Sequence, residues 1–456
     1  MNQEECKMKK SLTRRDFIST ASIVGAGLTI GLPTIACSSD GHLAKPAILG
    51  GPKAFTGNWP DWPIIDQVDE KELLDVLKSA KWCRLGGNTA SRFEDEFKKL
   101  TAAKHALGVS SGTNALYVML GALGVGPGDE VIIPPYTFVA TYNVVVLNYA
   151  LPIFVDTDLE SFQIDANKIE SAITNSTKVI MPVHLGGTPA DLDKILEVAG
   201  KHKIPVIEDA CQAHFAEWKG KCVGNWGLAG GFSFQASKNL NSGEGGAILT
   251  NDEMFSKKCY TFHNQGQGGS AAAFTTGSGT RGSNMRITEF QAGILLSQMT
   301  RVVTQANKRI ENADYLTRLL KDIPGIMPAK LYKGVTKSAY HLYMFRYDKT
   351  RFEGLDRFKF LDALQKEGIP CSNGYGKMNK DAYVTDLAKN PYYLKIYGEK
   401  TMSEWLERNQ CPENDKLTDQ AVWFFQTMLL GSKTDMEQIA EAIRKIQKNA
   451  IEISKT

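Results

Sequence analysis

Seven short apolar runs alternate with helical patterns between residues 105 and 251, and this alternation constrains the fold more than any other feature of the chain. Helical patterns at 114–123, 139–148, 165–173 and 192–202 fill most of the gaps. The runs lie at 105–110, 130–134, 152–156, 178–184, 205–210, 230–235 and 246–251. Such alternation predicts an α/β fold with a mostly parallel, doubly wound sheet in three layers. Ligands of these sheets bind where the strands end.

The remaining segments suggest four parts. Residues 1–36 are predicted to be an export signal, and residues 37–66, rich in Gly, Pro and Trp, an irregular arm. Residues 67–300 would form the large domain. Residues 301–456 would form a smaller α+β domain, with a strand at 339–348 and helices at 357–367 and 436–449.

Composition excludes several classes of protein. The chain has 53 Lys and Arg against 50 Asp and Glu, so a net charge of +3 provides no strong basic field for nucleic acid. The body contains no apolar run long enough to cross a bilayer. The eight cysteines are scattered, and spacing cannot assign disulfides to them. Cys211 and His214 look like half of a metal site without a second half, so we expect Cys211 to be a buried small side chain and no metal to bind.

The N-terminal segment has the features of an export signal. Charged residues up to position 16 precede a weakly apolar stretch at 18–35, which is typical of an export signal. Arg14-Arg15 resembles the twin-arginine signal. The sequence Thr34-Ile-Ala-Cys37 resembles a lipobox, in which Cys37 would be lipid-modified. We therefore expect a periplasmic or membrane-anchored protein; a cytoplasmic protein with a frayed N-terminal arm is the alternative.

Two strand ends carry groups that could act as a nucleophile and bind an anion. Lys238 follows the run at 230–235, and in a poorly solvated pocket its amine could act as a nucleophile and form a Schiff base. A solvated surface lysine is the alternative. Ser111-Gly112-Thr113 follows the run at 105–110 and opens a helix. Free amides at that helix start could bind an anion, although an ordinary helix cap would look the same.

Two further strand ends supply a carboxylate and an aromatic ring. Glu208-Asp209 ends the run at 205–210, and a carboxylate there could either cap a loop or pair with a protonated ring nitrogen. Tyr136 and Phe138 follow the run at 130–134, and an aromatic ring there could lie on a planar cofactor or pack in the core. The four segments together supply what a protein needs to hold pyridoxal 5'-phosphate.

These motifs resemble those of the DegT/StrS-type sugar aminotransferases, a branch of the fold-type I pyridoxal-phosphate enzymes. The resemblance extends from about residue 48 to the C-terminal helix. It rests on Ser-Gly-Thr at 111–113, Pro-Tyr-Thr-Phe at 135–138, Val-His-Leu-Gly-Gly at 183–187, Glu-Asp-Ala-Cys-Gln at 208–212, Phe-Ser-Phe-Gln-Ala-Ser-Lys at 232–238 and Gly-Ser-Asn-Met-Arg at 282–286.

The resemblance implies a role for each matching residue. Lys238 would form the Schiff base and carry protons, and Asp209 would pair with the pyridine nitrogen. The remaining cofactor contacts would be Gly112, Thr113 and Ser233 at the phosphate, Phe138 stacked on the ring, Gln212 near the ring hydroxyl and Asn284 at the phosphate of a neighbouring subunit. His184 and His341 would contact substrate. The family's active sites form between two chains, so a homodimer is expected.

The implied reaction moves an amino group from glutamate or glutamine to a keto sugar or keto-cyclitol. The segments at 48–52, 59–63 and 82–87 look most like those of members that act on keto-cyclitols and related unactivated rings. Two alternatives use the same fold: a pyridoxal-phosphate-binding sensor without turnover, and a sugar-binding lipoprotein.

Overall fold

The structure is a computed structural model that describes residues 45–268 and 281–456. The predicted export signal, with Arg14, Arg15 and Cys37, lies outside the described residues. Within the described ranges, no helix combines the length and the apolar character that crossing a membrane requires. The six cysteines that the structure describes are all free thiols.

All seven apolar runs form strands. Four strands pair in the order β1-β9-β8-β5, and three in the order β3-β2-β4. Parallel bridges from Ile180 to Val206 and from Val183 to Asp209 join the two sets. Of the seven, only β9 runs antiparallel to its neighbours. The bounds are β1 (His105–Val109), β2 (Glu130–Ile133), β3 (Leu151–Phe154), β4 (Thr177–Ile180), β5 (Ile207–Asp209), β8 (Ala229–Ser233) and β9 (Gly246–Thr250).

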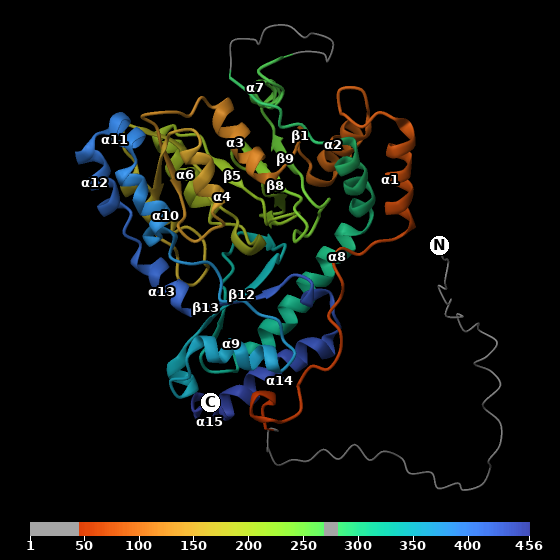
Figure 1. The fold of residues 1–456 in the computed structure, drawn as a ribbon, viewed down its shortest axis with the longest axis vertical. Helices are drawn as coiled ribbons and strands as arrows, with labels where there is room; N and C mark the ends of the chain where they lie inside the picture. The colour runs from red at the N-terminus through yellow and green to blue at the C-terminus, as the bar shows by residue number, and fades with distance from the viewer. Residues whose placement is uncertain (1–44, 269–280) are drawn as a thin grey trace, which may run out of the picture. The chain divides into compact units, whose positions relative to one another are not determined.

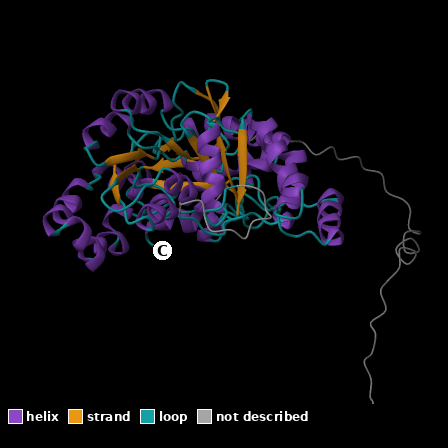
Figure 2. Ribbon diagram, turned by 90° about the horizontal axis from the view of Figure 1, so that it is seen from above, coloured by secondary structure: helices purple, strands orange, loops and turns teal. Residues whose placement is uncertain are grey.

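Both faces of this sheet are covered, which explains why its strands read as continuous apolar runs. On β9, Ile248 packs in the same core as residues of α3 (Gly112–Ala122) and α7 (Glu253–His263). Its neighbour Leu249 packs in the core that contains α2 (Thr89–Thr101) and the first half of α8 (Glu289–Lys321). Helices therefore lie on opposite sides of the strands (Figure 2).

A second, antiparallel sheet forms near the C-terminus, and its central strand falls within the strand predicted at 339–348. It contains β10 (Ile326–Pro328), β12 (Leu342–Tyr347) and β13 (Ala421–Phe425) in that order. Helices α9 (Arg357–Lys366) and α14 (Lys433–Lys448) share its apolar core. Figure 1 shows these two helices beside the end of α8.

Residue 300, the predicted domain boundary, lies inside α8 rather than in a linker. Leu295 on this helix packs in a core of the large sheet, whereas Leu316 packs in the core of the second sheet. One continuous helix of 33 residues therefore serves both cores.

Part of the C-terminal half packs on the large sheet, which the sequence analysis did not anticipate. Tyr393 and Trp405 are buried in a core of the large sheet. The indole of Trp405 donates a hydrogen bond of 2.6 Å to the carbonyl of Pro152. The helices concerned are α10 (Ala382–Thr385), α11 (Pro391–Tyr397) and α12 (Glu399–Arg408). The region 301–456 is thus not wholly a separate unit.

The arm at 45–66 is anchored at both ends. The amides of Ala47 and Ala54 donate to the buried carboxylate of Glu367, at 2.8 and 2.7 Å. Lys445 lies 2.8 Å from the same carboxylate. At the other end, the indole of Trp62 donates to the carbonyl of Ala236, in the loop that follows β8. The arm therefore reaches the strand end where Lys238 was predicted to act.

Candidate active site

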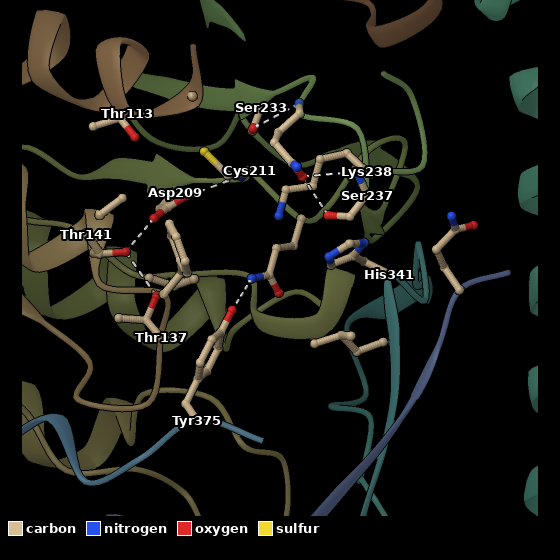
Figure 3. Close-up of a pocket in the computed structure, with 18 of the residues that line it drawn as sticks. Thr113, Thr137, Thr141, Asp209, Cys211, Ser233, Ser237, Lys238, His341 and Tyr375 are labelled. Carbon is tan, nitrogen blue, oxygen red and sulfur yellow. Dashed lines mark hydrogen bonds between the residues drawn. The ribbon is translucent and has the colours of Figure 1, made fainter. Parts of the chain in front are cut away.

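A cavity of about 680 Å³ lies at the carboxyl ends of β5 and β8. Its walls come from the start of α3, the segment after β2, the loop after β8, and the strands β12 and β13. Figure 3 shows several of the lining side chains directed toward one another. Of the ten predicted site residues, eight line it: Gly112, Thr113, Phe138, Asp209, Gln212, Ser233, Lys238 and His341.

Lys238 lies in a tightly bonded loop between β8 and β9. The amide of Ala236 donates to the carbonyl of Gly243, and that of Phe234 to Gly245, both at 2.8 Å. Burial lowers the pKa of the Lys238 ammonium, while Cys211 and Asp209 act in the opposite direction. This environment matches the predicted poorly solvated amine rather than a surface lysine.

The start of α3 forms a cradle against β8. Its first amides have no partner within the helix, so they can bind an anion. A β-carbon on Gly112 would lie 2.5 Å from the β-carbon of Ser233, and one on Gly246 would lie 2.4 Å from the carbonyl oxygen of Ser111. Only glycine permits this approach, which brings the Ser233 hydroxyl beside the helix start.

Asp209 ends β5 with both carboxylate oxygens oriented. Oδ2 accepts a hydrogen bond of 2.8 Å from the hydroxyl of Thr141, and Oδ1 accepts one of 3.2 Å from the amide of Cys211. Thr137 lies 2.9 Å from Thr141 and extends the network (Figure 3). Neither threonine was predicted to act at the site, although Thr137 belongs to the Pro-Tyr-Thr-Phe motif at 135–138.

Gln212 connects the large sheet to the C-terminal part of the site. Its Oε1 accepts from the amide of Gly186 at 2.7 Å, and its Nε2 donates to the hydroxyl of Tyr375 at 3.0 Å. Burial raises the pKa of Tyr375 to about 12, so the phenol is protonated at neutral pH. Tyr375 was not predicted, because its segment carries no motif of its own.

His341 and Phe138 line the cavity in different ways. His341 is buried with Nδ1 3.3 Å from the side-chain oxygen of Asn239. Its pKa is lowered well below the usual value, first by burial and then by the charge of Lys238, so the ring is neutral. Phe138 is 56% exposed, which leaves its ring available to a ligand.

His184 does not line the cavity. It is fully buried, with Nε2 2.9 Å from the carboxylate of Glu208 and Nδ1 accepting from the amide of Ala190. Glu208 also accepts from the amides of Gly224 and Gly227. The structure therefore gives His184 a buried carboxylate partner in place of the predicted substrate contact.

Asn284 is exposed and lies outside the cavity of its own chain. Its side-chain oxygen accepts from the amide of Arg286 at 3.4 Å. An exposed side chain is able to contact a neighbouring subunit. The predicted contact of Asn284 with the phosphate in that subunit stays a prediction.

The donor set fits a phosphorylated pyridine aldehyde. Free helix amides and hydroxyls suit the phosphate, Asp209 suits a protonated ring nitrogen and Lys238 suits an aldehyde. Residues 45–268 and 281–456 contain no group of three His, Cys, Asp or Glu side chains that could hold a metal. His214, next to Cys211 in the sequence motif, instead bonds the carbonyl of Ser233 at 2.8 Å.

Several known proteins are similar to this chain in sequence and in fold. An L-glutamine:2-deoxy-scyllo-inosose aminotransferase from Streptomyces kanamyceticus is 35% identical over 402 residues, covering 85% of this chain and 93% of the relative. A 3-amino-5-hydroxybenzoate synthase from Amycolatopsis mediterranei is 32% identical, covering 84% and 96%. The crystal structure of 3-amino-5-hydroxybenzoic acid (AHBA) synthase superposes with a TM-score of 0.75 at 30% identity, covering 87% of this chain and 99% of that one.

A family model matches residues 63–444, nearly the whole described chain. The match confirms the resemblance found in the motifs. The chain belongs to the DegT/DnrJ/EryC1/StrS aminotransferase family.

Proposed function

We propose that this protein is an aminotransferase that uses pyridoxal 5'-phosphate to move an amino group from glutamine or glutamate to a keto-cyclitol or keto sugar. The family is pyridoxal-phosphate dependent. The observation that carries the proposal is one cavity that unites the Lys238 amine, the Asp209 carboxylate and the start of α3.

The cofactor would be held by residues from four segments. Gly112, Thr113 and Ser233 would bind the phosphate at the start of α3, and Asp209 would pair with the protonated ring nitrogen. Phe138 would cover one face of the ring, and Gln212 would lie near its hydroxyl side; both residues line the cavity. When bound, the cofactor supplies an electron sink that stabilises negative charge on the substrate carbon.

Lys238 performs the proton transfers. Its lowered pKa increases the fraction of free amine at neutral pH, which favours both attack on an aldehyde and general base catalysis. Nζ takes a proton from the carbon of the amino donor and later returns one to the acceptor carbon. Asp209, held by Thr141, keeps the ring nitrogen protonated throughout.

A neutral polyhydroxylated ring is the acceptor that the rest of the cavity suits. Tyr375 and Trp423 present aromatic surface to it, and Gln426 and Thr427 add hydrogen-bonding groups. The Streptomyces kanamyceticus relative is named for glutamine and 2-deoxy-scyllo-inosose. We therefore favour glutamine as donor and an unactivated keto-cyclitol as acceptor.

Two half-reactions test the proposal. Glutamine alone should remove the absorbance band of the Schiff base with Lys238, and 2-deoxy-scyllo-inosose added afterwards should restore it. Lys238→Ala should lose both responses. Cofactor binding with no response to any amino donor would favour the sensor, and no cofactor binding would favour the sugar-binding protein. Turnover restricted to nucleotide-linked keto sugars would contradict the unactivated acceptor.

We also propose a homodimer with shared active sites. Exposed apolar side chains gather on α1 (Gln67–Ser79) and just after it: Leu73, Leu74, Leu77 and Trp82. Such a surface commonly lies in an interface. Asn284 is exposed as well, which suits a role in the neighbouring chain's site.

We also propose export by the twin-arginine route, which the predicted signal at residues 1–36 supports. This route moves folded proteins, so it would suit an enzyme that binds its cofactor before export. Changing Arg14 and Arg15 together to Lys should retain the protein in the cytoplasm, as cell fractionation would show. Cys37→Ser should release an exported protein from the membrane if Cys37 is lipid-modified. An unchanged distribution in the first variant would favour the cytoplasmic alternative.

A further inference from the structure

Arg309 on α8 is a buried cation that forms no ion pair within the part of the chain that the structure describes. Its side chain is fully buried. Nε donates to the side-chain oxygen of Gln426 at 2.8 Å, but Nη1 and Nη2 have no hydrogen-bond partner within 45–268 and 281–456. Burial lowers the pKa of Arg309 to about 9, so the guanidinium is still charged at neutral pH. A neutral amide on one nitrogen does not balance that charge.

Another arginine on the same helix, Arg301, has its charge balanced by carboxylates. Arg301 is paired with the carboxylates of Asp66 and Asp69 and also donates to the carbonyl of Ile64. Among residues 45–268 and 281–456, the partners of Arg309 are Gln426 and the ring of Trp62, whose centroid lies 5.0 Å from the guanidinium carbon. Aromatic contact favours a cation but leaves its in-plane donors unused.

Arg309 lies directly behind the wall of the cavity. Both Trp62 and Gln426 line the cavity that contains Lys238. The positive charges of Lys238 and Arg309 both lower the pKa values of His214 and His341, so both cations lie within electrostatic reach of the same two rings. An anion beside Arg309 would therefore be near the amine of Lys238.

We propose that Arg309 binds a carboxylate of the amino donor. The inference rests on the proposed function and names the residue that recognises its donor. A guanidinium binds a carboxylate through two parallel hydrogen bonds, which is what Nη1 and Nη2 can still make. Trp62 belongs to the irregular arm and is held to the loop of Lys238 by one hydrogen bond of 3.1 Å. A carboxylate in the cavity would reach Nη1 and Nη2 of Arg309 once the ring of Trp62 moves aside.

The first test measures binding without turnover. Glutarate carries two carboxylates and no amine, so it cannot react. Calorimetric titration of the cofactor-loaded protein should show binding that weakens at least about tenfold in Arg309→Gln. Arg301→Gln is the matched control and should bind glutarate as the parent protein does. Equal affinity in Arg309→Gln, or no binding by the parent protein, would overturn the proposal.

The second test separates the two half-reactions. In Arg309→Lys, which keeps the charge but loses the paired donors, the glutamine concentration for half-maximal rate should rise while the maximal rate changes little. The half-reaction with 2-deoxy-scyllo-inosose, which has no carboxylate, should keep its parent rate. Equal losses in both half-reactions would contradict donor recognition. Arg309-dependent glutarate binding without any glutamine reaction would instead refute only the proposed function.

Discussion

The hydroxyl of Thr141 lies 2.8 Å from Oδ2 of Asp209. Thr141 belongs to α4 (Ala140–Val146), which follows β2 in the chain, and Asp209 ends β5. The bond therefore holds the carboxylate at the end of β5 against a helix that is distant in sequence. The second carboxylate oxygen is held by the amide of Cys211. Asp209 is therefore oriented before any ligand binds, which lowers the entropic cost of binding a ring nitrogen.

Thr141→Val should weaken cofactor binding without unfolding the protein. Loss of one side-chain hydrogen bond costs about 1 kcal/mol, or about fivefold in affinity. Fluorescence titration with pyridoxal 5'-phosphate measures the change. Thr300→Val is the control, because that hydroxyl bonds the Ser297 carbonyl within α8. Unchanged affinity in Thr141→Val would show that the backbone amide alone orients Asp209.

Gly112→Ala should separate α3 from β8. The added methyl would meet Ser233 at 2.5 Å and the sulfur of Cys211 at 3.0 Å. We expect a loss of about 1–3 kcal/mol in the free energy of unfolding and a larger relative loss of cofactor affinity. Gly126→Ala is the control, since a β-carbon there meets nothing within 4 Å. Urea denaturation and cofactor titration measure the two effects.

The sequence predicted the large sheet because strands buried on both faces leave continuous apolar runs. It could not predict the direction of β9, which follows β8 through the Lys238 loop without a crossover helix. Residues such as Thr141 and Tyr375 were missed because long-range contacts, rather than local motifs, bring them to the site. The packing of Trp405 against Pro152 was missed for the same reason.

Glu208→Gln should destabilise the fold. Burial alone would raise the pKa of Glu208, but the hydrogen bond from His184 and the amides of Gly227 and Gly224 hold it below the usual value. Breaking this buried pair should cost about 3 kcal/mol. The control is Glu160→Gln, whose pair with Lys330 is exposed and should matter by less than about 1 kcal/mol.

The Glu208 effect should depend on pH. A carboxyl whose pKa is lowered on folding stabilises the protein above its unfolded-state pKa, and that contribution is lost as the pH falls through the lowered folded-state value. The difference between the parent protein and Glu208→Gln in urea denaturation should therefore shrink in acid. If the difference in the free energy of unfolding did not change with pH, the loss in Glu208→Gln would come from altered packing and not from the charge of Glu208.

Lys238→Met should raise the melting temperature of the cofactor-free protein at neutral pH. Burial lowers the pKa of Lys238, so folding disfavours its charged form, and the methionine removes that cost. The cost falls as the pH rises through the lowered folded-state pKa and vanishes above the usual lysine value. Melting curves between neutral pH and pH about 10 should therefore converge. An increase in melting temperature that grows with pH would contradict a lowered pKa of Lys238 in the folded protein.

Mixing two impaired variants tests whether Asn284 acts across a dimer. Lys238→Ala and Asn284→Ala should each be impaired alone. In a mixed dimer, the site that retains Lys238 would receive an intact Asn284 from its partner, whereas the other site would lose both residues. A refolded equal mixture should therefore contain about a quarter of the parent number of working sites, because half of its dimers are mixed and each has one good site. Activity no higher than the sum of the separate variants would place Asn284 in its own chain's site or outside the reaction.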